Sequence, residues 1–146
     1  ETGKEGVFAA GDIAEFYDVI FERNHAVGNW TNAFLQGKAA GLNMAGRKTV
    51  FHHVQGYSIS NLGFQITSLG EIEVGEGMET ISRANPPFHK YESFFLKDGI
   101  IKGAFIINMF SDKPVIARWI ENKVSVEHIK DNLADIDFNL ADVIIS

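Results

Sequence analysis

A glycine–aspartate pair near the N-terminus carries the most specific chemistry in this sequence. The short apolar run 7–10 (VFAA) leads directly into Gly11 and Asp12. Such a run is typical of a strand buried in a parallel sheet, and ligands of open α/β sheets bind beyond the carboxyl ends of these strands. Gly11 has no side chain, so a ligand can approach the backbone. The Asp12 carboxylate can accept hydrogen bonds from two hydroxyls of a sugar or polyol.

A helix is predicted over residues 29–45, shortly after this pair. Asn29 is a suitable N-cap, and Gly46 is a suitable C-terminal stop. The N-terminus of a helix offers free N–H groups and a partial positive charge, which stabilise a ligand that becomes anionic. Reduced flavin is such a ligand, and Trp30 in the first turn is placed to pack beside a flat ring.

One face of this helix is predicted to be buried, because its apolar and small residues recur at steps of three and four. The small residues among them would allow close approach of another backbone, and the large ones are expected in the core. The predicted buried face consists of Trp30, Ala33, Phe34, Gly37, Ala40, Gly41 and Met44.

Residues 6–46 resemble the second FAD-binding motif of the FAD-dependent pyridine nucleotide-disulfide oxidoreductase family. The resemblance is carried by VFAAGD at 7–12 and by the pattern WxxAxxQGxxAGxNMxG at 30–46. It is nearest to the branch of NAD(P)H oxidases, NADH:nitrite reductases and ferredoxin or rubredoxin reductases.

The resemblance implies roles for individual residues. Asp12 would hold the ribityl chain of FAD, and Gly11 would permit close approach of the cofactor. The N–H groups around Asn29, Trp30 and Thr31 would face the pyrimidine edge of the flavin. It assigns no catalytic residue.

The second half of the chain is predicted to be an antiparallel sheet with helices on one side. Strands are expected at 64–69 and 78–84, and Asp98-Gly99 between two apolar runs is a strong hairpin signal. A helix capped by Asp112, with Pro114 in its first turn, would bury Val115, Ile116, Trp119 and Ile120. A short helix is expected from Ser125, and the tail after Asp135 is expected to be extended.

The chain is therefore predicted to be α+β, with the last strand and helix of an α/β FAD-binding domain followed by the antiparallel domain. The polar link at Arg47 and Lys48 marks the predicted boundary. Residues 1–47 would be the C-terminal end of the FAD-binding domain. Residues 48–146 would be the family's C-terminal α/β domain. In the family this domain covers the flavin, and in many members it contributes to dimer contacts. A homodimer therefore stays an open possibility.

Composition excludes several other functions. The net charge of −6 and the lack of a basic stripe argue against nucleic acid. The absence of cysteine removes disulfides, thiolate zinc sites and a cysteine nucleophile. His52 and His53 are adjacent, so on a strand they would face opposite ways, and no metal site is expected. No apolar run is long enough for a membrane span, so a cytoplasmic location is expected.

The function expected for the whole protein is transfer of hydride from NAD(P)H to FAD, and of electrons onward to a second acceptor. In the family the glycine-rich loops and any redox cysteine lie N-terminal to this region. We therefore expect a C-terminal piece that is inactive alone. The choice of NADH or NADPH and the identity of the acceptor stay open. The alternative is a non-catalytic α+β module that dimerises or binds a partner through its sheet.

Overall fold

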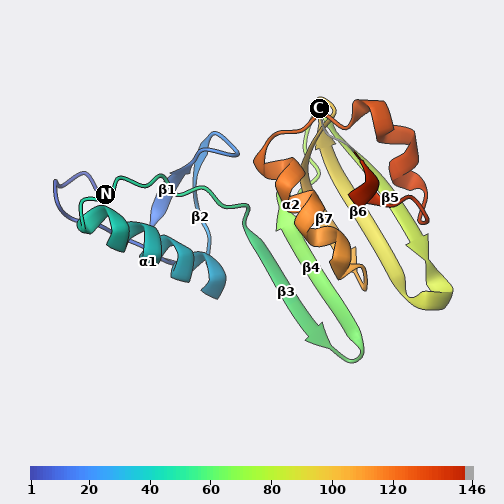
Figure 1. Cartoon of the computed structure of the whole chain (residues 1–146), viewed down its shortest axis with the longest axis horizontal. Helices are drawn as coiled ribbons and strands as arrows, with labels where there is room; N and C mark the ends of the chain where they lie inside the picture. The colour runs from blue at the N-terminus through green and yellow to red at the C-terminus, as the bar shows by residue number, and fades with distance from the viewer. Residues whose placement is uncertain (144–146) are drawn as a thin grey trace. The chain divides into compact units, whose positions relative to one another are not determined.

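The computed structural model describes residues 1–143, which fall into two compact units divided after Gln55. Figure 1 shows their elements. We call Glu1–Gln55 the N-terminal unit and Gly56–Ser146 the C-terminal unit. Within residues 1–143 no helix has the length and apolar character that crossing a membrane would require.

The C-terminal unit is built on one antiparallel sheet, as predicted. Its strand order is β3-β4-β7-β6-β5, and every neighbouring pair is antiparallel. Strand β3 was not foreseen by the sequence reading, which placed the first strand at 64–69. The strands are β3 (Gly56–Asn61), β4 (Phe64–Gly70), β5 (Met78–Asn85), β6 (Lys90–Lys97) and β7 (Ile100–Ile107).

The predicted hairpin joins the two central strands. Asp98 and Gly99 connect β6 to β7, with φ values of 52° and 72°. Positive φ at both central residues defines the type I′ turn, whose twist matches that of the flanking strands. The Asp-Gly signal is therefore confirmed. Short 3₁₀ segments η1 (Pro86–Phe88) and η2 (Phe110–Asp112) lie beside these strands in the sequence.

Helix α2 (Lys113–Glu121) packs on β7 and β4 across one face of the sheet (Figure 1). Ile116, Trp119 and Ile120 are buried, as predicted, and Pro114 occupies the first turn. Asp112 immediately precedes the helix, but its side chain makes no capping hydrogen bond. Its carboxylate instead pairs with an arginine, described below.

The chain after α2 folds back on the sheet. The short helix expected from Ser125 is present as the 3₁₀ segment η3 (Glu127–Ala134), which contacts β5. The expectation of an extended tail after Asp135 is wrong in part. Residues Leu140–Asp142 form a further 3₁₀ turn, η4, because the Leu140 side chain is buried in the core.

The N-terminal unit consists of a small hairpin and one long helix. Strands β1 (Glu15–Asp18) and β2 (Arg23–Ala26) pair antiparallel, and α1 spans Trp30–Met44. No strand was predicted from the sequence in this region. The hairpin turn is held by Asp18, whose buried Oδ1 accepts the N–H of Ile20 at 2.8 Å.

The strand predicted at 7–10 is not formed. None of the described strands pairs with this segment, and an extended run without a neighbour has no ladder of hydrogen bonds to hold it. A local turn forms just before it, in which the Val7 N–H donates to the Lys4 carbonyl. Val7 itself is exposed.

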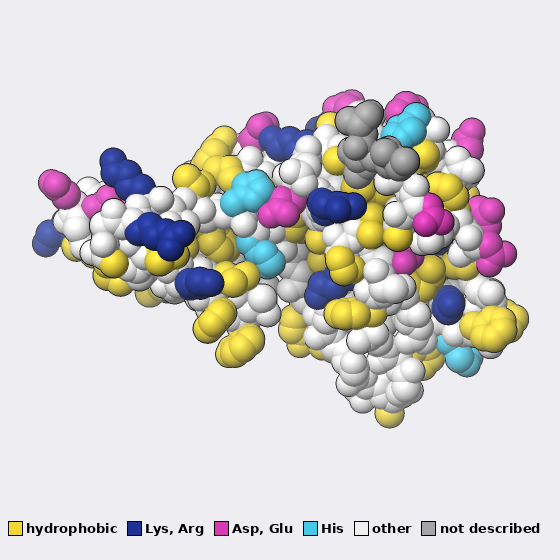
Figure 2. Space-filling model, viewed as in Figure 1, with side chains coloured by type: hydrophobic (Ala, Val, Ile, Leu, Met, Phe, Trp, Pro, Cys, Tyr) yellow, Lys and Arg dark blue, Asp and Glu magenta, His cyan; other side chains and the backbone are white. Residues whose placement is uncertain are grey.

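Helix α1 has the predicted bounds but exposes the face that was expected in the core. Trp30, Phe34 and Met44 are 81%, 61% and 65% exposed. The buried residues of the helix are Asn32 and Gln36. The spacing correctly grouped the apolar residues on one face, but within this unit the polar face is the one that packs. Figure 2 shows hydrophobic side chains at the surface along α1.

Candidate functional site

The Gly11 turn is fixed on both sides. Gly11 has φ +86°, a conformation that favours glycine. Its N–H donates to Gln36 Oε1 at 2.8 Å, and its carbonyl accepts the Ala14 N–H at 2.9 Å. A Cβ added to Gly11 would lie 3.4 Å from the Ala33 Cβ, so the turn lies directly against α1. The backbone beside Asp12 is thereby held in one position.

Asp12 occupies the exposed corner of this turn. Its Cγ and Oδ2 lie 3.8 Å from the position that a Cβ on Gly28 would take, so the carboxylate rests beside the residue that precedes the helix cap. No described residue donates a hydrogen bond or a salt bridge to it. A carboxylate in this position is available to the hydroxyls of a ligand.

The N-terminus of α1 lies beside the same carboxylate. Asn29 Oδ1 accepts the Asn32 N–H at 2.8 Å, and the Asn29 carbonyl accepts the Ala33 N–H at 3.0 Å. The N–H groups of Trp30 and Thr31 belong to the first turn and have no intrahelical acceptor. The structure thus brings Gly11 and Asp12 to the helix end that carries Asn29, Trp30 and Thr31.

Trp30 does not lie in a core. Its ring stacks on that of Phe34, with centroids 5.9 Å apart and planes 12° from parallel. The side chain of Trp30 is 81% exposed, so the ring face turned away from Phe34 is open. The core role first expected for Trp30 is therefore wrong within this unit, while the neighbouring-ring role stays a prediction.

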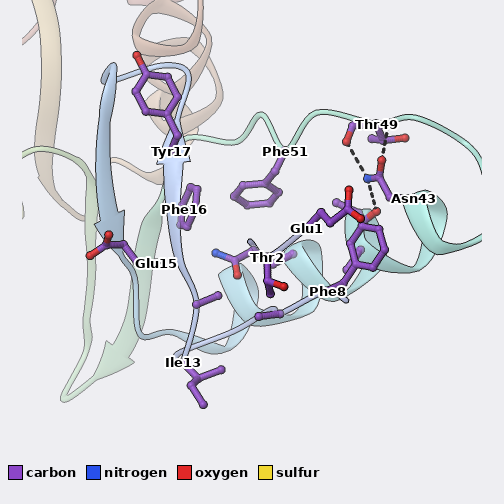
Figure 3. Close-up of a pocket in the computed structure, with 15 residues that line it drawn as sticks. Glu1, Thr2, Phe8, Ile13, Glu15, Phe16, Tyr17, Asn43, Thr49 and Phe51 are labelled. Atoms are coloured by element: carbon purple, nitrogen blue, oxygen red, sulfur yellow. Dashed lines mark hydrogen bonds between the residues drawn. The ribbon is translucent and has the colours of Figure 1, made fainter. Parts of the chain in front are cut away.

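A cavity of about 540 Å³ lies in the N-terminal unit (Figure 3). One end is closed by Asn43, which accepts the Thr49 N–H at 3.1 Å and donates to the Thr49 carbonyl at 2.8 Å. The lining mixes apolar and aromatic side chains with polar ones. It consists of Glu1, Thr2, Phe8, Ala9, Ile13, Ala14, Glu15, Phe16, Tyr17, Gln36, Ala39, Ala40, Asn43, Thr49 and Phe51.

A buried charge cluster lies in the C-terminal unit, in the core. Arg83 donates from Nε to Glu92 Oε2 at 2.7 Å and from Nη2 to Asp112 Oδ2 at 2.8 Å. Its Nη1 donates to the carbonyls of Asp135 and Phe138. Burial raises the pKa of Glu92 to about 7, against the opposing charge of Arg83. Because Arg83 and Glu92 are fully enclosed, the cluster ties the C-terminal segment to the sheet and offers nothing to a ligand.

The sequence reading missed Gln36, Arg83 and Glu92. Asn29, Asn32, Gln36 and Asn43 form a second stripe on the helix at steps of three, four and seven, which could have indicated a buried polar face. Glu92 lies two residues before the buried Phe94 on β6, so both side chains lie on the same face of the sheet. Arg83 is the residue of β5 that pairs with Glu92, so it lies on that face as well. Their position on the inward face was the available signal.

The residues present fit a cofactor that carries a polyol next to an anionic edge. The exposed Asp12 carboxylate, the Gly11 backbone and a helix terminus with Trp30 and Thr31 N–H groups that lack intrahelical acceptors meet at one place. Among residues 1–143, His, Asp and Glu side chains do not gather in threes that could hold a metal ion.

Comparison with known proteins agrees with this reading of the fold. Residues 59–124 match the family model described as the rubredoxin NAD+ reductase C-terminal domain. No curated protein matched the chain.

Three solved structures illustrate the likeness. NADH:rubredoxin oxidoreductase from Clostridium acetobutylicum is 27% identical, with a TM-score of 0.61, over 91% of this chain and 35% of that one. The covalent putidaredoxin reductase–putidaredoxin complex matches at 17% identity and TM-score 0.78, over 90% of this chain and 31% of that one. A FAD-dependent pyridine nucleotide-disulphide oxidoreductase from Desulfovibrio vulgaris matches at 15% identity and a TM-score of 0.72, over 89% of this chain and 35% of that one.

The chain therefore spans about a third of the length of these solved relatives. Two of the three likenesses are at low identity and concern the fold, while the family model and the rubredoxin oxidoreductase concern the sequence as well. Residues 59–124 thus match the rubredoxin NAD+ reductase C-terminal domain, and the chain has the fold of the corresponding third of FAD-dependent pyridine nucleotide-disulfide oxidoreductases.

Proposed function

We propose that this chain supplies one wall of the flavin site and the C-terminal domain of an oxidoreductase that passes hydride from NAD(P)H to FAD. The observation that carries the proposal is the meeting of Gly11, the free Asp12 carboxylate and the N-terminus of α1. FAD, when bound, supplies the redox chemistry, accepting hydride and passing electrons on.

Asp12 binds the cofactor through its ribityl hydroxyls. The carboxylate is exposed, lies at the corner of a turn with both Gly11 backbone groups hydrogen-bonded, and has no competing donor among the described residues. Hydrogen bonds to a charged acceptor are stronger than those between neutral groups. Gly11 contributes by letting the turn that carries Asp12 lie directly against Ala33 of α1.

The N–H groups of Trp30 and Thr31 stabilise negative charge on the flavin pyrimidine edge. The helix end adds a partial positive charge to these two donors. Because that charge develops on the flavin only when it is reduced, the helix terminus favours the reduced form and raises the potential. Asn29 holds this terminus in shape through its bond to Asn32.

The second acceptor is a small electron-carrier protein or another oxidant. One similar protein is in complex with putidaredoxin and another is an NADH:rubredoxin oxidoreductase, which supports a carrier protein as the partner. The C-terminal domain serves the assembly of the enzyme, with a homodimer as one form. A purely non-catalytic module has no need of the Gly11–Asp12 turn beside a helix terminus.

The proposal is tested by the FAD affinity of the complete flavoprotein that contains this chain. Asp12→Ala removes charge-assisted hydrogen bonds and is expected to weaken FAD binding by about 10- to 100-fold. Asp137→Ala, which removes another exposed carboxylate, in the C-terminal unit, is the matched control and should bind FAD as the parent does. An unchanged dissociation constant in Asp12→Ala would overturn the assigned role.

A further inference from the structure

We infer that Gln36 is a positioning residue for flavin binding: its side-chain amide holds the Gly11 turn in the shape that presents Asp12. This inference rests on the proposed function and extends it to a residue that does not itself touch the cofactor. Gln36 lies on α1, 25 positions along the chain from Gly11.

The contact between them is buried and specific. Gln36 is 6% exposed, and its Oε1 accepts the Gly11 N–H at 2.8 Å. The Gly11 backbone is buried too, so this N–H has no water to replace a lost acceptor. A buried donor left without a partner is costly, and the turn would have to move to satisfy it.

The turn also packs against Ala33 of α1, but its other hydrogen bond does not reach the helix. The Gly11 carbonyl accepts the Ala14 N–H, which closes the turn on itself but does not tie it to the helix. The Gln36 amide is therefore the hydrogen bond that connects the Asp12 turn to the helix whose N-terminus completes the site. Its loss frees Asp12 to shift relative to the Trp30 and Thr31 N–H groups.

The orientation of the amide follows from this one bond. Gly11 N–H is a donor, so the oxygen of Gln36 must face it. The nitrogen, Nε2, is buried and has no acceptor among residues 1–143, and the side chain lines the cavity of Figure 3. Among residues 1–143 no other hydrogen bond fixes the orientation of this amide. The bond to Gly11 is therefore the reason that a glutamine suits this position.

The test compares two replacements of similar size in the complete flavoprotein. Gln36→Met fills the same space but offers no strong acceptor, whereas Gln36→Glu keeps an oxygen facing Gly11. We expect Gln36→Met to weaken FAD binding by about tenfold and Gln36→Glu to stay close to the parent. Gln65→Met, the same change on β4, is the control and should leave FAD affinity unchanged.

A role in packing alone predicts the opposite order, since methionine suits a buried site better than a carboxyl group does. The midpoint of thermal unfolding is therefore measured for each variant. If FAD affinity merely follows that midpoint, with Gln36→Glu the weaker binder, the inference is overturned.

Asp12→Ala separates the two levels of the proposal. Loss of FAD affinity in Asp12→Ala, with both Gln36 variants binding like the parent, overturns the role of Gln36 and leaves the proposed function standing. Unchanged affinity in Asp12→Ala overturns the proposed function, and the role of Gln36 falls with it.

Discussion

The two helices of this chain use their faces in opposite ways. Helix α2 buries its apolar residues Ile116, Trp119 and Ile120 against the sheet. Helix α1 buries Asn32 and Gln36 and leaves Trp30, Phe34 and Met44 exposed. Helix α2 thus adds to the hydrophobic core of the C-terminal unit, whereas α1 is held in its unit by polar side chains that reach backbone groups.

The difference teaches what a helical pattern predicts. Spacing at three and four residues correctly identified which residues share a face in both helices. It does not say which face finds a partner, because that depends on the neighbouring elements. In α1 the polar side chains form hydrogen bonds with the backbone of the segments before and after the helix. Asn32 bonds to Val27, Gln36 to Gly11 and Asn43 to Thr49.

The two tryptophans provide the sharpest contrast between the units. Trp119 is fully buried, so Trp119→Ala should lower the free energy of unfolding of the C-terminal unit by about 4 kcal/mol through lost transfer energy and a cavity. Trp30→Ala should change stability by less than about 0.5 kcal/mol, since the ring is mostly in solvent. Urea denaturation of the chain, followed by circular dichroism, measures both. Equal effects would break the comparison.

The buried arginine extends the contrast to charges. Arg83→Met leaves Glu92 and Asp112 without their partner and should cost about 3 kcal/mol or more in the C-terminal unit. The double variant Arg83→Met, Glu92→Leu removes the buried charge as well and should recover part of the loss. A double variant less stable than Arg83→Met would show that the unpaired Glu92 charge is not the cause of the lost stability.

The raised pKa of Glu92 makes the C-terminal unit sensitive to pH. Burial raises this pKa from 4.5 to about 7, so the folded state holds the proton more tightly than the unfolded chain does. Stability from this group is therefore present at low pH and declines as pH rises between these two values. From about pH 5 to pH 7.5 the free energy of unfolding should fall by on the order of 2 kcal/mol.

Glu92→Gln is the control for this pH dependence. It keeps the shape of the side chain and removes the titration, so its stability should be nearly level over the same range. Chemical denaturation at several pH values measures both proteins. A parent as level as the variant would contradict the raised pKa.

The smallest effect concerns the cap of α1. Asn29→Ala removes the acceptor for the Asn32 N–H and should destabilise the helix by about 1 kcal/mol. Hydrogen exchange of the Asn32 amide reports this locally. Thr31 is an exposed residue in the same first turn of α1. Thr31→Ala therefore serves as the control and should leave the exchange rate of the Asn32 amide unchanged.

The C-terminal sheet was predictable because its signals are local. Asp98 and Gly99 specify their turn by backbone conformation, and Asp112 with Pro114 marks the start of α2. Strand β3 was missed because most of its residues are exposed and its sequence, GYSISN, has no inward apolar alternation. The η4 turn was missed because Leu140 is buried by residues distant in the sequence.

The candidate site was predictable in its parts but not in its support. Gly11, Asp12 and the cap at Asn29 follow from short motifs, and the structure places them at one helix end. Gln36 could not be singled out, since its partner lies 25 residues away and the bond depends on how the turn packs on α1. The run 7–10 lacks its predicted strand because a strand also requires a neighbour, which the sequence of the run does not specify.

The most direct test of the account is the flavin content and reduction of the complete protein that contains this chain. Released flavin is identified and counted after denaturation, and the native protein is titrated with NADH and NADPH in the absence of oxygen while its visible absorbance is recorded. The account predicts bound FAD in proportion to the chain and loss of its absorbance with one of the two nucleotides. A protein that folds without flavin, or whose flavin neither nucleotide reduces, would contradict it.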